Sequence, residues 1–179
     1  MPNLVICVSG KIGSGKTSIS KEVSSLINVP YFSTGDFIKE IAAQRGIELV
    51  DRKTLQAIGL EYVNRGWNKF SSDFLTYCNW SGTMSLLIDG VRDHNFFLAI
   101  REAVNPIRSI LVYIESDELV RVKRIEYRDS SYIAEMDSHE TESGYDLIRS
   151  NSDIVVENNQ SPKCVAKEVV NAISCIFKL

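Results

Sequence analysis

Eight residues near the start of the chain have the types and the spacing needed to bind phosphate groups. Residues 10–17 read Gly-Lys-Ile-Gly-Ser-Gly-Lys-Thr, which fits the pattern G-x-x-x-x-G-K-[ST]. Glycines at positions 10, 13 and 15 allow the backbone to turn so that its N–H groups point inward around phosphate oxygens. We expect Lys16 to reach the outer phosphates and Thr17 to hold a magnesium ion. Phosphate binding is therefore the first chemistry that the sequence predicts.

The segments on either side of this motif are those that its mechanism requires. An apolar run over 3–9 predicts a buried strand, and apolar residues at helical spacing over 18–28 predict a helix. A helix that begins directly after the glycines presents its positive end to the phosphates. A glycine-rich turn that binds nothing is the alternative, but it does not account for this context. The residues predicted to bind the nucleotide are Gly10, Gly13, Ser14, Gly15, Lys16, Thr17 and Ser18.

Two aspartates and an arginine follow later strands of the predicted sheet. Asp89 ends the apolar run 85–88, Arg92 follows it by three residues, and Asp36 follows the run 29–32. Ligands of open α/β sheets bind at the carboxyl ends of the strands, so these side chains face the same crevice as the glycines. We expect Asp89 to lie beside the magnesium ion and Arg92 to clamp a second phosphate. The alternatives are a turn or helix-capping role for Asp89 and a surface pair of Arg92 with Asp93 or Asp89.

The other elements must place these residues at one edge of a sheet. Strand-like runs alternate with helical stretches, which predicts an α/β fold with a mostly parallel five-stranded sheet. The interval 35–80 is nearly all helical in pattern, with breaks at Gly46, Gly66 and the cluster 71–73, and predicts two or three extra helices. Ser161 and Pro162 predict the start of a final helix. The predicted strands cover 4–8, 29–32, 85–88, 109–114 and 153–156.

Length and composition limit the class of protein. The 179 residues correspond to one domain, with 44% hydrophobic and 24% charged residues. No apolar run approaches the roughly 18 residues of a membrane span, and the start lacks a secretion signal, so we expect a cytoplasmic protein. Four scattered cysteines without a C-x-x-C pair are typical of reduced core thiols. The net charge of -3 argues against a general nucleic-acid surface.

The three strand-end motifs together resemble the P-loop nucleoside monophosphate kinase group, which is related to dephospho-coenzyme A kinase. They are the phosphate loop, the segment Ser33-Thr34-Gly35-Asp36, and Asp89-Gly90 followed by Arg92. The resemblance implies a three-layer P-loop fold, ATP and Mg²⁺ as donor and metal, and a small-molecule nucleotide as acceptor. It also implies that Asp36 helps to hold magnesium-bound water and the acceptor. Where the group has an arginine three residues after this aspartate, the chain has Lys39, which cannot make a bidentate contact.

Four positions of the 35–80 insertion, Arg52, Gln56, Gly59 and Arg65, and the segment 89–95 are similar to phage-type deoxynucleoside monophosphate kinases and their bacterial and archaeal relatives. In that resemblance the insertion covers the acceptor base and ribose, with Gln56 or Arg65 supplying polar contacts. Solvent-facing helix positions are an equal alternative for all four. We also predict that Thr34 and Lys39 bind the acceptor. The later pair Asn158 and Asn159 lies either near the nucleotide base or in an ordinary turn.

Arg121, Arg124 and Arg128 recur at the spacing that puts three guanidinium groups on one helix face. In the kinase group, arginines at the end of this helix and in the lid after it surround the transferred phosphoryl group. We therefore predict a lid over 125–145 with Arg124 and Arg128 as catalytic residues. A solvated charged face is the alternative.

Three functions remain open from the sequence. The leading hypothesis is ATP-dependent phosphoryl transfer to a nucleoside or deoxynucleoside monophosphate. Phosphorylation of a non-nucleotide alcohol, with Asp36 as general base, is the second. A nucleotide-binding switch with little catalysis is the third. The sequence decides neither the acceptor nor the oligomeric state.

Overall fold

A parallel sheet forms the centre of the molecule. The computed structural model describes residues 3–47, 51–126 and 143–178. Within them, five strands pair in the order β2-β3-β1-β4-β5, and every pair is parallel. The predicted α/β fold and its parallel sheet are confirmed. The strands are β1 (Leu4–Ser9), β2 (Tyr31–Ser33), β3 (Leu86–Asp89), β4 (Arg108–Glu115) and β5 (Ile154–Glu157).

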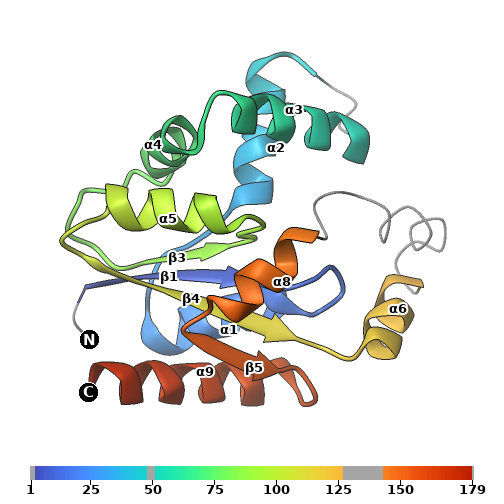
Figure 1. Ribbon diagram of the computed structural model, residues 1–179, viewed down its shortest axis with the longest axis vertical. Coiled ribbons are helices and arrows are strands. Elements are labelled where there is room, and N and C mark those ends of the chain that lie inside the picture. The colour runs from blue at the N-terminus through green and yellow to red at the C-terminus, as the bar shows by residue number, and fades with distance from the viewer. Residues whose placement is uncertain (1–2, 48–50, 127–142, 179) are drawn as a thin grey trace.

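Helices cover both faces of the sheet, which gives three layers (Figure 1). Side chains of β1 alternate between two cores: Val5 and Cys7 belong to one, Ile6 and Val8 to the other. A strand buried on both faces reads as a continuous apolar run, which is why 4–8 could be recognised. Helices α1 (Lys16–Ile27) and α9 (Pro162–Phe177) lie on one face, and α5 (His94–Ala103) and α8 (Ser143–Ser150) lie on the other. Helix α6 (Glu118–Glu126) follows β4.

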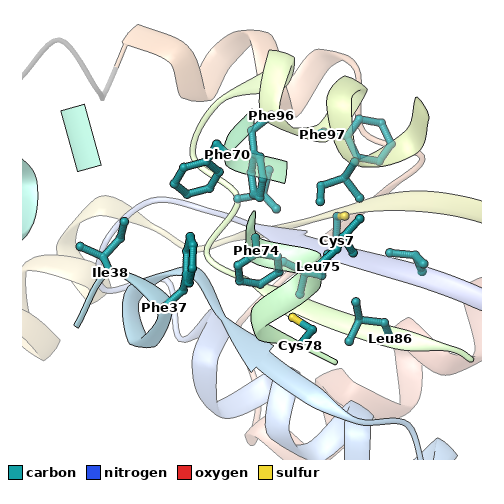
Figure 2. Close-up of a cluster of buried hydrophobic side chains, with 14 of the residues drawn as sticks. Cys7, Phe37, Ile38, Phe70, Phe74, Leu75, Cys78, Leu86, Phe96 and Phe97 are labelled. Carbon is teal, nitrogen blue, oxygen red and sulfur yellow. The ribbon is translucent and has the colours of Figure 1, made fainter. Parts of the chain in front are cut away.

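Three helices form the insertion between β2 and β3: α2 (Thr34–Gln44), α3 (Arg52–Asn64) and α4 (Trp67–Tyr77). An aromatic cluster packs α2 and α4 against α5, because rings of these three helices point toward one another (Figure 2). The ring centroids of Phe37 and Phe74 are 5.5 Å apart, and those of Phe70 and Phe96 are 4.9 Å apart. Edge-to-face aromatic pairs of this kind stabilise packing beyond their buried area.

The predicted breaks at Gly46 and Gly66 are confirmed, since both residues have positive φ between helices. The predicted break at 71–73 is wrong. These residues lie inside α4, where Ser71 is buried and Lys69 pairs with Asp73 at helical spacing, 2.6 Å from nitrogen to oxygen. The apolar side chains at 67, 70 and 74 decide the conformation, and they outweigh the weak turn preference of two serines and an aspartate.

At the carboxyl end, Ser161 caps α9 by accepting a hydrogen bond from the Cys164 N–H, and Pro162 occupies the first turn, as predicted. All four cysteines are free; Cys7 and Cys78 are buried, whereas Cys164 and Cys175 are exposed on α9. The expectation of core thiols therefore holds for two of the four. In the described part of the chain, no helix combines the length and apolarity needed to cross a membrane.

Candidate functional site

The loop between β1 and α1 has the shape that phosphate binding requires. Gly13 and Gly15 have φ of 79° and 85°, in the left-handed region that favours glycine. A Cβ atom on Gly13 would lie 2.9 Å from the Arg121 carbonyl oxygen, and one on Gly15 would collide with the Asn158 side chain. Gly15 is also the N-cap of α1 and supplies no side chain to its first N–H groups. Those groups are therefore left for a ligand anion.

Three polar side chains of this segment differ in their surroundings. The Lys16 ammonium donates to the Lys11 carbonyl at 3.4 Å and lies within the loop. The Ser14 hydroxyl is buried and has no hydrogen-bond partner in the described part of the chain. Ser18 is exposed in the first turn of α1. Gly10, at the start of the loop, passes so close to β4 that a Cβ would collide with the Ile114 carbonyl.

Thr17 and Asp89 meet as the motif predicts. The Thr17 hydroxyl donates to Asp89 Oδ2 at 2.7 Å, across 72 residues of sequence. The Tyr31 hydroxyl donates to the same oxygen at 2.9 Å. Desolvation and the Asp89 carboxylate both raise the pKa of Tyr31 well above its ordinary value, so this hydroxyl stays protonated as a donor. One carboxylate oxygen is thus held by two hydroxyl groups.

The other oxygen of the same carboxylate fits a magnesium site. Asp89 is only 2% exposed, and its Oδ1 is buried without a hydrogen-bond partner among the described residues. A buried carboxylate oxygen left unpaired is unfavourable unless a cation or its bound water approaches it. Oxygen ligands are those that Mg²⁺ prefers, and the ion commonly keeps several waters. Thr17 and Asp89 therefore have the chemistry and the placement needed to hold it.

The ends of β2 and β3 are joined beside this site. Ser33 caps α2 by accepting from the N–H groups of Gly35 and Asp36, which places Asp36 in the first turn. The Thr34 hydroxyl donates to the Gly90 carbonyl at 2.9 Å. Asp36 and Lys39 form an ion pair of 2.8 Å, with 52% and 60% of their side chains exposed. Both side chains are thus accessible to a ligand.

Arg92 has neither of the surface partners considered for it. Asp89 is held by Thr17 and Tyr31, and Asp93 caps α5 by accepting from the Asn95 N–H at 2.7 Å. Arg92 is exposed and forms no ion pair with a carboxylate of residues 3–47, 51–126 or 143–178. Within the described part of the chain, its guanidinium group is thus left for a ligand at the carboxyl end of β3.

Arg65 and Gln56, predicted to supply polar contacts to the acceptor, differ in their hydrogen-bond partners. Arg65, at the end of the helix, pairs with Glu61 and lies over the Tyr62 ring, 5.1 Å from its centroid. Glu61 also accepts two hydrogen bonds from Arg45 of the preceding segment, and these contacts lower its pKa and raise that of Arg45. Gln56 is half-buried, and its side chain makes no hydrogen bond to another described residue.

Arg124 contacts the loop directly. Its Nη1 donates to the carbonyls of Gly13 and Ser14 and to the Ser116 hydroxyl at 3.2, 3.4 and 3.3 Å. Arg121 donates to the Ile12 carbonyl at 3.0 Å from the same helix, α6, which lies beside the loop (Figure 1). The solvated-face interpretation does not describe these two residues, because both are turned toward the loop. Arg128 and most of the predicted 125–145 lid lie outside the described residues.

A family model described as an AAA domain matches residues 6–143, more than half of the chain. The chain belongs to this AAA domain family. Among curated relatives, the cytidylate kinase of Pyrobaculum islandicum is 28% identical over 129 residues, covering 70% of this chain and 61% of the relative. The cytidylate kinase of Pyrobaculum neutrophilum is 27% identical over 143 residues, which cover 74% of this chain and 64% of the relative. The chain therefore spans less than two thirds of the length of these relatives.

Solved structures show that this AAA domain protein has the P-loop kinase fold. Shikimate kinase from Aquifex aeolicus superposes with a TM-score of 0.56 at 16% identity, covering 97% of this chain and 98% of the other. APS kinase from Mycobacterium tuberculosis, in complex with AMPPNP and APS, superposes with a TM-score of 0.59 at 15% sequence identity. The match covers 97% of this chain and 99% of the other. The predicted fold and the resemblance to P-loop nucleotide kinases are confirmed.

Sequence reasoning missed two residues of the site. Tyr31 was read only as part of a strand, because a tyrosine in a β run is ordinary and nothing local marks its hydroxyl as a partner of Asp89. Asn158 was assigned to a base site or a turn, yet it is buried and its amide donates to the Ser14 carbonyl at 2.7 Å. Both contacts cross long stretches of sequence, and only the register of the sheet reveals them.

Proposed function

We propose that this protein transfers the γ-phosphoryl group of ATP to a nucleoside or deoxynucleoside monophosphate in a magnesium-dependent reaction. The hydrogen bond from Thr17 to Asp89 carries the proposal, because it joins the phosphate loop to the end of β3 in one metal-binding unit. The cytidylate kinase relatives support a nucleotide as acceptor.

The donor is held by the loop. Backbone N–H groups at the start of α1 and the Lys16 ammonium bind the phosphates of the triphosphate. Thr17 and Asp89 would hold magnesium, and Asp36 would approach it through water. Magnesium, when bound, neutralises negative charge on the phosphates and fixes their orientation.

The acceptor lies between the loop and the α2–α4 insertion, with 35–80 as the acceptor-binding segment. Arg92 and Lys39 bind its phosphate, since both are exposed cations near strand ends and Arg92 has no ion-pair partner among the described residues. Thr34 and Asp36 orient it from the first turn of α2. Gln56 and Arg65 supply polar contacts from α3.

Transfer proceeds in line from donor to acceptor without a covalent enzyme intermediate. The rate arises from positioning and from cations aimed at the charge on the transferred group. Lys16 and Arg92 approach this group from the donor and acceptor sides. Arg124 and Arg128 add positive charge from α6 and the lid.

A coupled assay for ADP formation across the common ribo- and deoxyribonucleoside monophosphates tests the proposal. We expect ADP formation that depends on magnesium and on one class of monophosphate. Lys16→Ala should reduce turnover by at least about 10²-fold, because an electrostatic contact to the transferring group is lost. Lys167→Ala, a lysine on the far helix α9, is the charge-matched control and should retain full activity. Unchanged turnover in Lys16→Ala would refute the assignment.

A second candidate is phosphorylation of a non-nucleotide alcohol. The observation that favours it is the exposed Asp36 carboxylate beside Lys39, where the nucleotide kinase group has arginine. In this case Asp36 accepts the proton of the acceptor hydroxyl. Including sugars and shikimate in the panel separates the two. With an alcohol acceptor, Asp36→Asn should abolish turnover, because the general base is lost. With a monophosphate acceptor it should lower turnover only partly, because no general base is needed and only the contributions of Asp36 to magnesium-bound water and to acceptor position are lost.

A further inference from the structure

Three side chains donate hydrogen bonds to backbone carbonyls on the outer side of the phosphate loop. Arg121 donates to the carbonyl of Ile12 at 3.0 Å, Arg124 to those of Gly13 and Ser14 at 3.2 and 3.4 Å, and Asn158 to that of Ser14 at 2.7 Å. Three consecutive carbonyl groups are therefore held by residues of α6 and of the segment after β5. We call Arg121, Arg124 and Asn158 the outer clamp.

The outer clamp has a direct consequence for the inner side of the loop. In a trans peptide, the carbonyl of one residue and the N–H of the next point in opposite directions. Carbonyls of Ile12 and Ser14 that are held outward therefore turn the N–H groups of Gly13 and Gly15 inward, toward the position of the phosphates. The Ser14 N–H is engaged differently and donates to the Lys11 carbonyl at 3.1 Å. Glycines with positive φ allow the loop to adopt this conformation, but they also allow others. The hydrogen bonds of the outer clamp stabilise this one.

Arg121 contributes a charge as well as a hydrogen bond. It is only 8% exposed, and it forms no ion pair with a carboxylate in the described part of the chain. It lines a cavity of about 330 Å³ beside the loop. Glu115 of this cavity is already bound to Arg149 by two hydrogen bonds of 2.8 and 3.0 Å. The other ionisable side chains that line the cavity are Lys11, Tyr113, Glu118 and Asp146.

A buried cation is unfavourable when little offsets its desolvation, and among the described residues no carboxylate lies within ion-pair distance of Arg121. The phosphates of a bound nucleotide would supply negative charge on the other side of the loop. The cost of burying Arg121 is thus carried by the nucleotide-free protein and is relieved when the phosphates bind. A buried charge of this kind is expected to favour ligand binding more than it stabilises the fold.

We propose that Arg121 is a positioning residue for the phosphates of the donor nucleotide, acting through the Ile12 carbonyl and through its buried charge. Arg124 and Asn158 support the same loop conformation. The inference rests on the donor half of the proposed function and is independent of which acceptor is used.

Three substitutions separate the two contributions of Arg121. Arg121→Met removes charge and donor, Arg121→Gln keeps a donor without the charge, and Arg121→Lys keeps both the charge and a donor, so the difference between the Gln and Lys variants isolates the charge. The affinities for ATP and for ADP are measured by calorimetry, without acceptor. We expect Arg121→Met to weaken both by about 10-fold to 100-fold, the range for a lost contact to a charged group, and the other two variants to fall between it and the wild type. The KM for ATP should rise and the KM for the acceptor should not.

Thermal unfolding of the nucleotide-free variants distinguishes positioning from a structural role. The Tm of Arg121→Met should stay close to that of the wild type, because the substitution removes the desolvation cost of a buried charge together with its hydrogen bond to the Ile12 carbonyl. Arg101→Met is the matched control: Arg101 packs on the Phe97 ring, 5.2 Å from its centroid, and lines a different cavity at the start of β4. It should bind ATP as the wild type does.

Two results would overturn the proposal. The first is an affinity of Arg121→Met for ATP within twofold of that of the wild type. The second is a loss of ATP affinity that is proportional to the fall in Tm across all three variants. If Arg121→Met does not fold, Arg121→Gln and Arg121→Lys decide by the same two measurements. A wild-type protein that binds no ATP contradicts the proposed function itself, whereas one that binds ATP but phosphorylates no acceptor leaves the test of Arg121 intact.

Discussion

The proposed donor side and the proposed acceptor side of the candidate site are held together in different ways. On the donor side, Asp89 is 2% exposed and Arg121 is 8% exposed, and their hydrogen bonds join residues 72 and 109 positions apart. On the acceptor side, Lys39 bonds to Asp36 three positions away and Arg65 to Glu61 four positions away, all at the surface. Exposed pairs of this kind contribute little to stability, so a substrate can replace them at small cost. The fold thus fixes the residues proposed to bind the donor and leaves those proposed to bind the acceptor free to adjust.

A pair of glycine substitutions gives the largest expected effect and tests this difference directly. Gly15→Ala and Gly66→Ala both place a Cβ on a residue with positive φ. Gly15 is left-handed helical, with φ 85° and ψ 8°, where a side chain costs about 1–2 kcal/mol of folding stability. Gly66, with φ 95° and ψ 145°, lies in a region that side chains rarely adopt, where the cost is about 1–3 kcal/mol. At Gly15 the new atom also collides with Asn158, whereas at Gly66 nothing lies within 4 Å. We expect Gly15→Ala to lose measurable ATP binding and Gly66→Ala to retain it, by calorimetry. Equal affinities would mean that the donor loop tolerates displacement.

The next effect concerns the carboxylate held by two hydroxyl groups. Tyr31→Phe removes one donor to Asp89 Oδ2 and keeps the ring. Partners that orient a metal-binding group typically contribute about 10-fold to 100-fold in metal affinity or activity. We expect the magnesium concentration for half-maximal activity to rise about tenfold, with ATP binding in the absence of magnesium unchanged.

Tyr77→Phe is the control for that measurement. Its ring packs against Phe32 at 6.0 Å between centroids, and its hydroxyl makes no hydrogen bond to another described residue. The magnesium dependence of this variant should match the wild type. A rise in both variants would assign the effect to general packing near β2 and not to Asp89.

A smaller effect is expected where the acceptor phosphate binds. Lys39→Ala should raise the KM for the acceptor by about tenfold, because one charged contact is lost, and leave the KM for ATP unchanged. Lys39→Arg should lower the KM for a monophosphate acceptor, since guanidinium can contact two phosphate oxygens. Lys69→Ala, which removes another exposed, helix-paired lysine, is the control. If Lys39→Ala raises the KM for ATP instead, Lys39 belongs to the donor side.

The sequence predicted those parts of the molecule whose signals are local. The strands, the glycine loop and the Gly46 and Gly66 breaks depend on neighbouring residues, and their positions agree with the structure within a few residues. The meeting of Thr17 with Asp89 could also be foreseen, because both follow parallel strands at the same edge of the sheet.

The contacts of the outer clamp could not be predicted. The spacing of Arg121 and Arg124 places them on one helix face, but it does not say against what that face packs. Their partners are backbone carbonyls, which carry no sequence signal. Asn158 likewise occupies a position where a turn residue is ordinary, and only the path of β5 beside β4 brings it to Ser14.

The smallest effect is expected at the exposed ion pair of Glu61 and Arg65 in α3. Glu61 accepts hydrogen bonds from Arg45 and Arg65, which lower its pKa. A carboxylate with a lowered folded-state pKa stabilises the fold above its unfolded pKa of about 4.3, and this contribution disappears as the pH falls through the folded-state value. Glu61→Gln should therefore lower Tm slightly at pH 7, and the difference from the wild type should shrink in acid. Turnover and both KM values should stay unchanged. A marked rise in the KM for the acceptor would show instead that Glu61 holds Arg65 in place for the substrate, and the acceptor side would then be more preorganised than its exposed ion pairs indicate.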